Sequence, residues 1–343
     1  MTVAEASPLS EKQWWFDTWN IEETVWPRTK GAGVTVAVID TGVNATLPDM
    51  RAAVVPGKSF QGSSSRDGRR DTQEGFGHGT GMASLIASRG NTTGFTGVAP
   101  KAKILPLVAP NVGTSTTAPA IRYAADHGAK VINISQGSPA FGGKACPDEV
   151  FEAVAYAVKK DAIVVAASGN EGDTTNEVTY PASCPGVVAI GAMDNQGRPW
   201  EKTQRQDYVA LGAPGVNIPA LSQDGRVWPN GAGTSHASAL AAGAFALLRA
   251  EYPKMSARRI VQLATDTAKD LGPKGKDNRF GHGVISLRTA LSRRFRRVRP
   301  TPCTSGWTRR WPNRTRRASP PRPLLPPRRD RATRARSSAS RRS

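Results

Sequence analysis

The chain has 343 residues and a formal net charge of +20, with 47 Lys and Arg against 27 Asp and Glu. Residues 293–343 hold 18 of the arginines, no Lys and one Asp, so the first 292 residues carry 29 basic and 26 acidic side chains and are close to neutral. This balance argues against a globular region built to bind nucleic acid. The sequence has no run of 18 apolar residues, which argues against a transmembrane helix. Its three cysteines lack the CxxC spacing of a zinc site.

The first part of the chain predicts an aromatic segment, a strand, a loop and a helix. We expect residues 13–26 to bury aromatic rings against the domain rather than to form a ligand site; the rings are those of Trp14, Trp15, Phe16, Trp19 and Trp26. The apolar, largely β-branched run 34–39 predicts a buried parallel strand that ends at Asp40. Residues 57–77 are rich in Gly, Ser, Arg and Asp and predict a loop, and His78 begins a small-residue segment that predicts a helix to Ser88.

The following residues alternate between strand and helix patterns. Apolar runs predict strands at 103–108, 131–135, 162–167 and 187–191, and helical periodicity predicts helices at 117–127, 148–160, 235–250 and 256–267. The helix at 235–250 is apolar on nearly all sides, so we expect it to be buried, and we expect Ser256 to cap the last helix. The alternation predicts an α/β fold with a parallel sheet, helices on both faces, and a site beyond the carboxyl ends of the strands.

Composition divides the chain into three regions. Residues 1–12 hold no apolar run of signal-peptide type and are expected to be a flexible extension, and residues 13–292 are expected to form one domain. From Arg293 onward Arg, Pro, Ser and Thr dominate, which predicts a disordered basic tail at 293–343. Two interpretations of this tail remain open: out-of-frame translation of GC-rich DNA, or a genuine tail that contacts phosphate or other polyanions.

Three glycine-rich blocks supply an Asp, a His and a Ser in that order. They are the segments 36–42 (VAVIDTG), 77–83 (GHGTGMA) and 231–237 (GAGTSHA). Their side chains are the parts of an acyl-transfer triad: Ser235 as nucleophile, His78 as general base and Asp40 as the group that orients the His. The Asp–His–Ser order separates this arrangement from other triad folds. A fourth block, 166–172 (AASGNEG), offers Asn170 as an oxyanion donor beside the backbone N–H of Ser235.

Structural roles are the alternatives for these residues. Ser235 would also suit the cap of a helix that follows a glycine turn. Among the other histidines, we expect His127 to lie at a surface helix end, His282 to be structural, and His236 to line the site without a direct catalytic role.

From about Gln13 to Leu291 the chain resembles the subtilisin-like serine proteases, and it looks most like the mycosin-type proteases of actinobacteria. The resemblance implies a three-layer subtilisin-like α/β fold and a serine endopeptidase that forms an acyl-enzyme. It also implies a protein or peptide substrate, no required cofactor, a monomeric state, and an extracellular or cell-envelope location, although no signal peptide is visible in this chain. The alternative is a pseudoprotease that binds peptides without cutting them.

The resemblance also assigns residues for binding and for a disulfide. Two backbone edges would hold the substrate; they map to Ser135, Gln136 and Gly137 and to Ala167, Ser168 and Gly169. The pocket floor maps near Thr179, where no Asp or Glu is evident, so a strong preference for Lys or Arg is not expected unless Glu171 reaches the rim. The resemblance to mycosin-type proteases implies a Cys146–Cys184 disulfide, and the alternative is two unpaired thiols in a reducing cytosol. Cys303 is expected to stay unpaired in either case.

Three positions need comment against the family pattern. Asp49 matches a position that is often a calcium ligand, but one carboxylate is not a site, so we assign no metal and leave structural calcium open. Gly81 and Ala239 stand where many relatives carry a His and a Pro. Neither position supplies a triad atom, so we expect activity to survive both departures.

Overall fold

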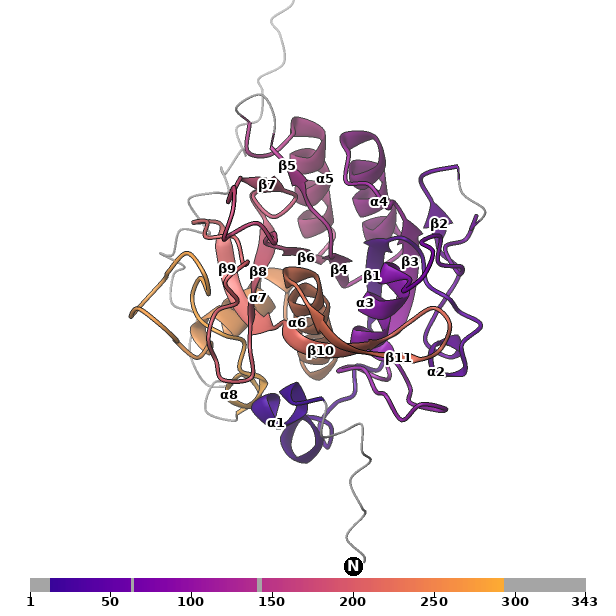
Figure 1. Ribbon diagram of the computed structural model, residues 1–343, viewed down its shortest axis with the longest axis horizontal. Coiled ribbons are helices and arrows are strands. Elements are labelled where there is room, and N and C mark those ends of the chain that lie inside the picture. The colour runs from indigo at the N-terminus through magenta and orange to yellow at the C-terminus, as the bar shows by residue number, and fades with distance from the viewer. Residues whose placement is uncertain (1–12, 63–64, 141–143, 293–343) are drawn as a thin grey trace, which may run out of the picture.

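A computed structural model describes residues 13–62, 65–140 and 144–292 (Figure 1). Its centre is a seven-stranded sheet with the order β2-β3-β1-β4-β6-β8-β9, in which every neighbouring pair is parallel. The strands are β1 (Thr35–Asp40), β2 (Lys58–Ser59), β3 (Lys103–Val108), β4 (Val131–Ile134), β6 (Ile163–Ala167), β8 (Val187–Met193) and β9 (Val209–Pro214). The predictions for residues 1–12 and 293–343 lie outside the described residues.

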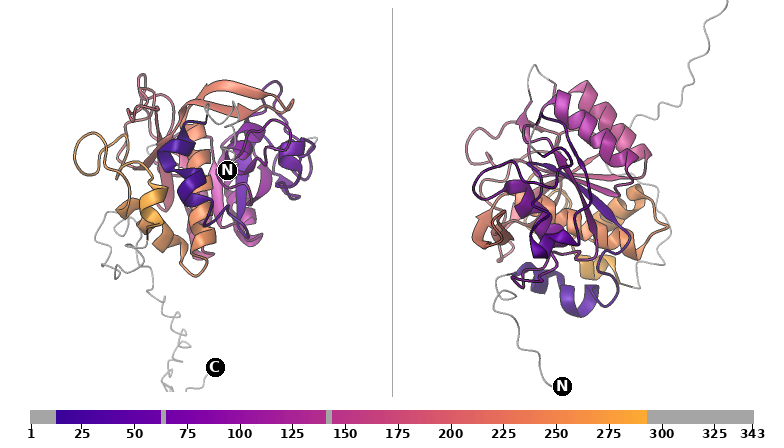
Figure 2. Two further views of the ribbon diagram at one scale, coloured as in Figure 1. Left: turned by 90° about the horizontal axis from the view of Figure 1, so that it is seen from below. Right: turned by 90° about the vertical axis from the view of Figure 1, so that its right-hand side faces the viewer.

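Helices cover both faces of this sheet, as the alternating pattern predicts (Figure 2). The helices α4 (Thr114–Asp126) and α5 (Asp148–Lys159) pack on one face. The opposite face is covered by α1 (Trp15–Trp19), η1 (Ile21–Val25), α2 (Pro48–Arg51), α3 (His78–Ala87), α6 (Thr234–Glu251), α7 (Ala257–Asp266) and α8 (Leu287–Ala290). Successive side chains of β1 enter opposite cores, because Val36 and Val38 pack on the α6 side while Ala37 and Ile39 pack on the α4–α5 side.

The helix α6 runs through the larger core and is buried along most of its length. Small side chains let it approach its neighbours closely: a Cβ added at Gly243 would lie only 2.9 Å from Cβ of Val98. This burial confirms the prediction, which rests on apolar residues on nearly all sides of the helix. None of the helices in the described ranges is both long enough and apolar enough to cross a membrane.

The aromatic segment near residue 13 is part of the core, as expected. Trp15 and Trp19 are fully buried, and the indole N–H of Trp19 donates to the carbonyl of Ile285 at 2.9 Å. Trp26 donates in the same way to the carbonyl of Val98 at 3.0 Å. These two indoles therefore bring their polar atoms to backbone acceptors far along the chain, which ties the start of the domain to distant segments.

Most predicted boundaries are right to within one or two residues, and Ser256 caps α7 by accepting a bond from the N–H of Arg259. The largest boundary error is at α4, which begins at Thr114 instead of residue 117. Threonine hydroxyls support this extra turn: Thr116 donates to the carbonyl of Gly113, and Thr117 accepts from its N–H. A prediction from the spacing of apolar residues does not detect hydrogen bonds of this kind between side chains and the backbone.

Sequence patterns also miss the short or polar strands. These are β5 (Ser138–Pro139), β7 (Thr179–Tyr180) and the hairpin β10 (Val216–Leu221) with β11 (Val227–Ala232), as well as β2. The predictions also miss β9, although it is six residues long and mostly buried. The β10–β11 register shifts twice, and β11 is mostly exposed, so no regular alternation marks it. The hairpin matters for the site because β11 leads directly into α6.

Candidate active site

The carboxyl end of β1 places Asp40 against the first residue of α3. Asp40 is fully buried, and Nδ1 of His78 lies 2.8 Å from its Oδ1 and 3.0 Å from its Oδ2. The N–H of Thr41 donates a further bond to Oδ1 at 2.8 Å, so the buried carboxylate has the partners that a buried charge requires. Close approach of the two elements depends on Gly79, where an added Cβ would lie 2.2 Å from the carbonyl oxygen of Gly42.

Asp40 sets the protonation behaviour of His78. Burial by itself lowers the pKa of His78, but the charge of Asp40, the hydrogen bond to Asp40 and the charge of Asp71 together raise this pKa above its usual 6.5. Because Nδ1 faces the carboxylate, Nε2 is the ring nitrogen left to accept a proton. This is the arrangement that a general base in a triad needs.

A second buried carboxylate lies near His78, and sequence patterns do not single it out. Oδ2 of Asp71 accepts bonds from the N–H of Thr80 at 2.8 Å and from its hydroxyl at 2.6 Å. Burial raises the pKa of Asp71, although its hydrogen bonds with Thr80 oppose the rise. Asp71 comes from a polar, glycine-rich loop without periodicity, and only its burial against the first turn of α3 distinguishes it.

Ser235 lies in the first turn of α6, directly after the turn at Gly233. Its Oγ donates to the carbonyl of Ser135 at 2.7 Å, and Oγ of Ser135 donates to the carbonyl of Ser235 at 3.0 Å. Within the described chain, Ser235 Oγ has no hydrogen bond to His78. Bonds between nucleophile and base are often long or misaligned until substrate binds, so this geometry does not argue against the pair.

Asn170 follows β6 and faces the same turn. Its Oδ1 accepts from the N–H of Thr234 at 3.0 Å and from the hydroxyl of Thr234 at 2.8 Å. Since a backbone N–H can only donate, the atom facing it is the amide oxygen, and Nδ2 points elsewhere. Nδ2 and the N–H nitrogen of Ser235 both lie 3.7 Å from the position that a Cβ on Gly233 would take, so the two predicted oxyanion donors lie around one point.

A cavity of about 490 Å³ is lined by Ser235 and Asn170 together with most of the predicted substrate residues, while Asp40 and His78 are not part of its lining. Its walls come from both predicted substrate edges, and Thr179 lies on its predicted floor. The lining residues are Pro110, Ser135, Gln136, Gly137, Pro139, Ala167, Gly169, Asn170, Glu171, Thr175, Glu177, Thr179, Gln204, Thr234 and Ser235.

Ser168 is the predicted substrate residue that does not line this cavity. Its side chain is fully buried, its N–H donates to Ile190, and its carbonyl accepts from the hydroxyls of Thr179 and Tyr208. Ser168 therefore supports the floor from below, because its backbone groups are already satisfied within the domain. The role of Ser168 in the second substrate edge stays a prediction.

The cavity lining is more acidic than the sequence analysis expects. Glu177 lines it together with Glu171, and the lining includes no Lys, Arg or His. Oε2 of Glu171 accepts from the N–H of Asn170 at 3.0 Å and from Nε2 of Gln204 at 3.2 Å. Glu177 stands two residues before Thr179, within a polar stretch where the sequence gives no sign of its direction.

His236 is buried beside the nucleophile, and its Nδ1 has no hydrogen-bond partner within the described residues. Burial and the neighbouring charge of His78 lower the pKa of His236 to about 3, so its ring is neutral near pH 7. An added Cβ at Gly231 would lie 2.4 Å from Nε2 of this ring. Gly231 therefore makes room for His236, and this ring does not compete with His78 for a proton.

Cys146 and Cys184 form a disulfide with their Cα atoms 5.0 Å apart, as the resemblance implies. The bond joins the loop before α5 to the loop after β7, the strand that carries Thr179 of the cavity floor.

The carboxylate of Asp49 is held by protein donors. It accepts bonds from the N–H of Thr92 and from the N–H and hydroxyl of Thr93. In the part of the chain that the structure describes, no group of three or more His, Cys, Asp or Glu side chains is arranged to hold a metal ion. The burial of Asp49 is thus explained by its three donors.

Gly81 is explained by its neighbour Phe76. A Cβ added at Gly81 would lie 2.5 Å from Cζ of that ring. The ring occupies the space that a larger side chain at position 81 would need.

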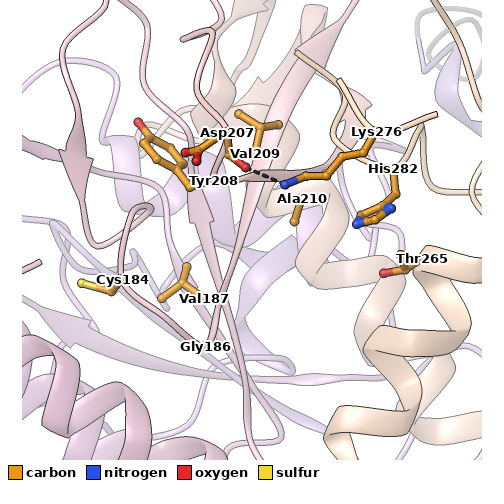
Figure 3. Close-up of a pocket in the computed structure, with 10 residues that line it drawn as sticks. All are labelled: Cys184, Gly186, Val187, Asp207, Tyr208, Val209, Ala210, Thr265, Lys276 and His282. Atoms are coloured by element: carbon orange, nitrogen blue, oxygen red, sulfur yellow. Dashed lines mark hydrogen bonds between the residues drawn. The ribbon is translucent and has the colours of Figure 1, made fainter. Parts of the chain in front are cut away.

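A smaller pocket of about 150 Å³ lies between β9 and the loop that carries Lys276 and His282 (Figure 3). Nζ of Lys276 donates to the carbonyl of Asp207 at 2.6 Å. Tyr208 lines this pocket, and its hydroxyl reaches the network under Thr179. No triad residue lines it, so it is separate from the candidate active site.

Comparison with known proteins was consistent in sequence and in structure. The profile of the subtilase family matches residues 31–283. The chain is 31% identical over 315 residues to fervidolysin of Fervidobacterium pennivorans, and this alignment covers 82% of the chain and 44% of fervidolysin. It is 34% identical over 267 residues to Subtilisin DY of Bacillus licheniformis, and this alignment covers 76% of the chain and 92% of Subtilisin DY. The solved structure of the protease MycP1 without its N-terminal propeptide gives a TM-score of 0.72 at 32% identity, covering 81% of this chain and 96% of that one. These similarities confirm the subtilisin-like and mycosin-like resemblance predicted from the motifs.

Proposed function

This chain belongs to the subtilase family of serine endopeptidases, and we propose that it cleaves peptide bonds with Asp40, His78 and Ser235 as its catalytic triad. The observation that carries the proposal is the contact of His78 Nδ1 with both carboxylate oxygens of Asp40, at the edge where Ser235 and Asn170 share one cavity. We further propose that residues 13–292 form the catalytic domain as a single unit.

The chemistry follows from the roles that these groups can take. Ser235 Oγ attacks the carbonyl carbon of the peptide while its proton passes to Nε2 of His78, and Asp40 stabilises the imidazolium that forms. The carbonyl oxygen becomes an oxyanion, which accepts bonds from Nδ2 of Asn170 and from the N–H of Ser235. The C–N bond then breaks, and the leaving amine takes the proton from His78.

The second half of the reaction reverses these steps with water. A water molecule gives a proton to His78 and attacks the acyl-enzyme ester, and the oxyanion again accepts bonds from the same two donors. When the ester C–O bond breaks, Ser235 Oγ regains its proton from His78 and the carboxylic acid leaves. The protons therefore balance over the cycle with water as the second reactant.

The substrate backbone is held in an extended form in this proposal. The backbone groups of Gln136 and Gly137 have no hydrogen-bond partner among the residues that the structure describes. They line the same cavity as Ala167 and Gly169 of the second predicted edge. A peptide that adds as a strand would satisfy these groups, which gives affinity through main-chain bonds.

The remaining expectations become proposals of the same kind. We place the protein outside the cytoplasm or in the cell envelope, because the resemblance to subtilisin-like and mycosin-type proteases implies this location. The described chain also holds a disulfide, which persists in oxidising compartments. A monomer that needs no cofactor and acts on a protein or peptide is the form we propose. The related protease MycP1 is an essential component of the type VII (ESX-1) secretion system.

Labelling and hydrolysis test the proposal together. A fluorophosphonate should label the protein at Ser235, and Ser235→Ala should lose the label and lower peptide hydrolysis by about 10⁴-fold or more. Wild-type turnover in the folded Ser235→Ala variant would refute the triad. Peptide binding by a wild-type protein that neither labels nor cleaves would support the pseudoprotease alternative.

A further inference from the structure

We propose that the substrate cavity selects a Lys or Arg side chain on the acyl side of the cleaved bond, and that Glu177 and Glu171 determine this specificity. The inference rests on the proposed function, because it takes the cavity beside Ser235 as the place where the substrate side chain binds. It goes beyond that function by naming the class of substrate.

The first support is the shared lining of the cavity. Ser235 and Asn170 line it at the reacting end, and Glu171 and Glu177 line the same space. A side chain that extends from the attacked carbonyl into this cavity therefore meets two carboxylates. With no Lys, Arg or His in the lining, these two charges have no counter-charge within the cavity itself.

The second support is the state of the two carboxylates. Glu171 is fixed through Oε2, which accepts bonds from Asn170 and Gln204, while within the described residues its Oε1 has no hydrogen-bond partner. Glu177 has neither a hydrogen bond nor an ion pair from its side chain to any residue in the described ranges. An unpaired carboxylate beside a binding cavity is a ready partner for an ammonium or guanidinium group.

The rest of the lining suits a long side chain with a charged end. Pro139 and Ala167 present apolar surface, against which the methylene groups of Lys or Arg can pack while the charge reaches the carboxylates. The floor is polar, because the hydroxyl of Thr179 bonds to Oε1 of Gln204. A purely apolar side chain would pair with neither carboxylate, so it would gain nothing from the two charges.

The effect should be moderate because both carboxylates are exposed. One exposed charge pair contributes about threefold in binding, so two together give a preference of about tenfold. The preference should weaken in high salt, since the screening length falls from about 10 Å at 0.1 M to about 3 Å at 1 M.

The test is a set of peptides that differ only at the residue before the cleaved bond: Arg, Lys, Leu, Phe or Glu. For the wild type, kcat/KM should be about tenfold higher for Arg and Lys than for Leu, and lowest for Glu. Glu177→Gln combined with Glu171→Gln should bring the Arg-to-Leu ratio close to one. The ratio is the readout because a general loss of activity, which Glu171→Gln could cause through Asn170, cancels in it.

Two further variants sharpen the result. Glu22→Gln removes the same charge from an exposed glutamate of η1 that lies outside the cavity, and it should leave the ratio unchanged. Glu177→Lys should lower kcat/KM for the Arg peptide and raise it for the Glu peptide. Equal or better cleavage after Leu or Phe by the wild type, or an unchanged ratio in the double variant, would overturn the inference.

The outcomes separate this inference from the proposed function. If Ser235 labels and the apolar peptides are cleaved best, the triad stands and only the specificity fails. If no peptide is cleaved, binding of the Arg and Leu peptides to Ser235→Ala, measured by fluorescence anisotropy, still compares the two side chains. Tighter binding of Leu there would overturn the specificity, and tighter binding of Arg would support it.

Discussion

Loss of the Cys146–Cys184 disulfide should destabilise the domain by an amount that can be worked out from the chain. The two cysteines are 38 residues apart, and the ring between them contains α5, β6 and β7. The chain-entropy description of a cross-link gives about 4 kcal/mol for a ring of this size, because the unfolded chain regains the freedom that the bond removed. For a domain of this length the same free energy corresponds to a fall in midpoint of roughly 8 °C.

The variant for this measurement is Cys146→Ser combined with Cys184→Ala, since Cys184 is buried and tolerates a small apolar side chain best. The comparison is made by scanning calorimetry in a Ser235→Ala background, which prevents self-digestion of unfolded protein. Cys303→Ser is the matched control and should leave the midpoint unchanged. A fall of less than about 2 °C, with mass spectrometry showing the wild-type bond intact, would refute the reasoning.

Three further predictions concern the site. The pKa of His78 is raised above 6.5, so kcat/KM should rise with pH through a midpoint above 6.5 as the ring loses its proton. In Asp40→Asn, a pH–rate series should show a lower midpoint and a plateau reduced by about 10⁴-fold. Asn170→Ala should lower kcat by about 10²–10³-fold, the loss for removing this donor in a subtilisin, while labelling of the nucleophile persists. Gly81→His should lower the free energy of unfolding by about 1–3 kcal/mol in a denaturant titration because its Cβ meets the ring of Phe76, and Phe76→Ala should relieve this clash; equal stability of Gly81→His and wild type would contradict the packing argument.

Much of the fold is readable from the sequence because its causes are local. The β-branched run before Asp40 forms a buried strand, and the small apolar residues after Ser235 form a buried helix, since in each case neighbouring residues fix the backbone and the buried surface. The parallel order of the strands then places their carboxyl ends at one edge. That rule brings Asp40 and Asn170 to the same edge before any distance is known.

Other features depend on contacts that no local pattern encodes. The start of α4 is set by threonine hydroxyls, and the hairpin β10–β11 is paired by its position in front of α6 and not by an alternating sequence. Asp71 and Ser168 look like ordinary loop residues, yet folding buries both of them. Whether a polar residue of a loop faces solvent or protein depends on which distant segment packs over it.

The sequence by itself determined the family, the order of the triad and the residues able to perform each step, because glycine-rich blocks around reactive side chains are recognisable without coordinates. The tertiary structure decided the distances between Asp40 and His78, the exclusion of Ser168 from the cavity, and the presence of Glu177 in it. Glu177 and Ser235 are far apart in the chain, and only the fold brings them to one cavity. The charge of a binding site is a sum over side chains from separate segments, so it exists only once those segments have packed together.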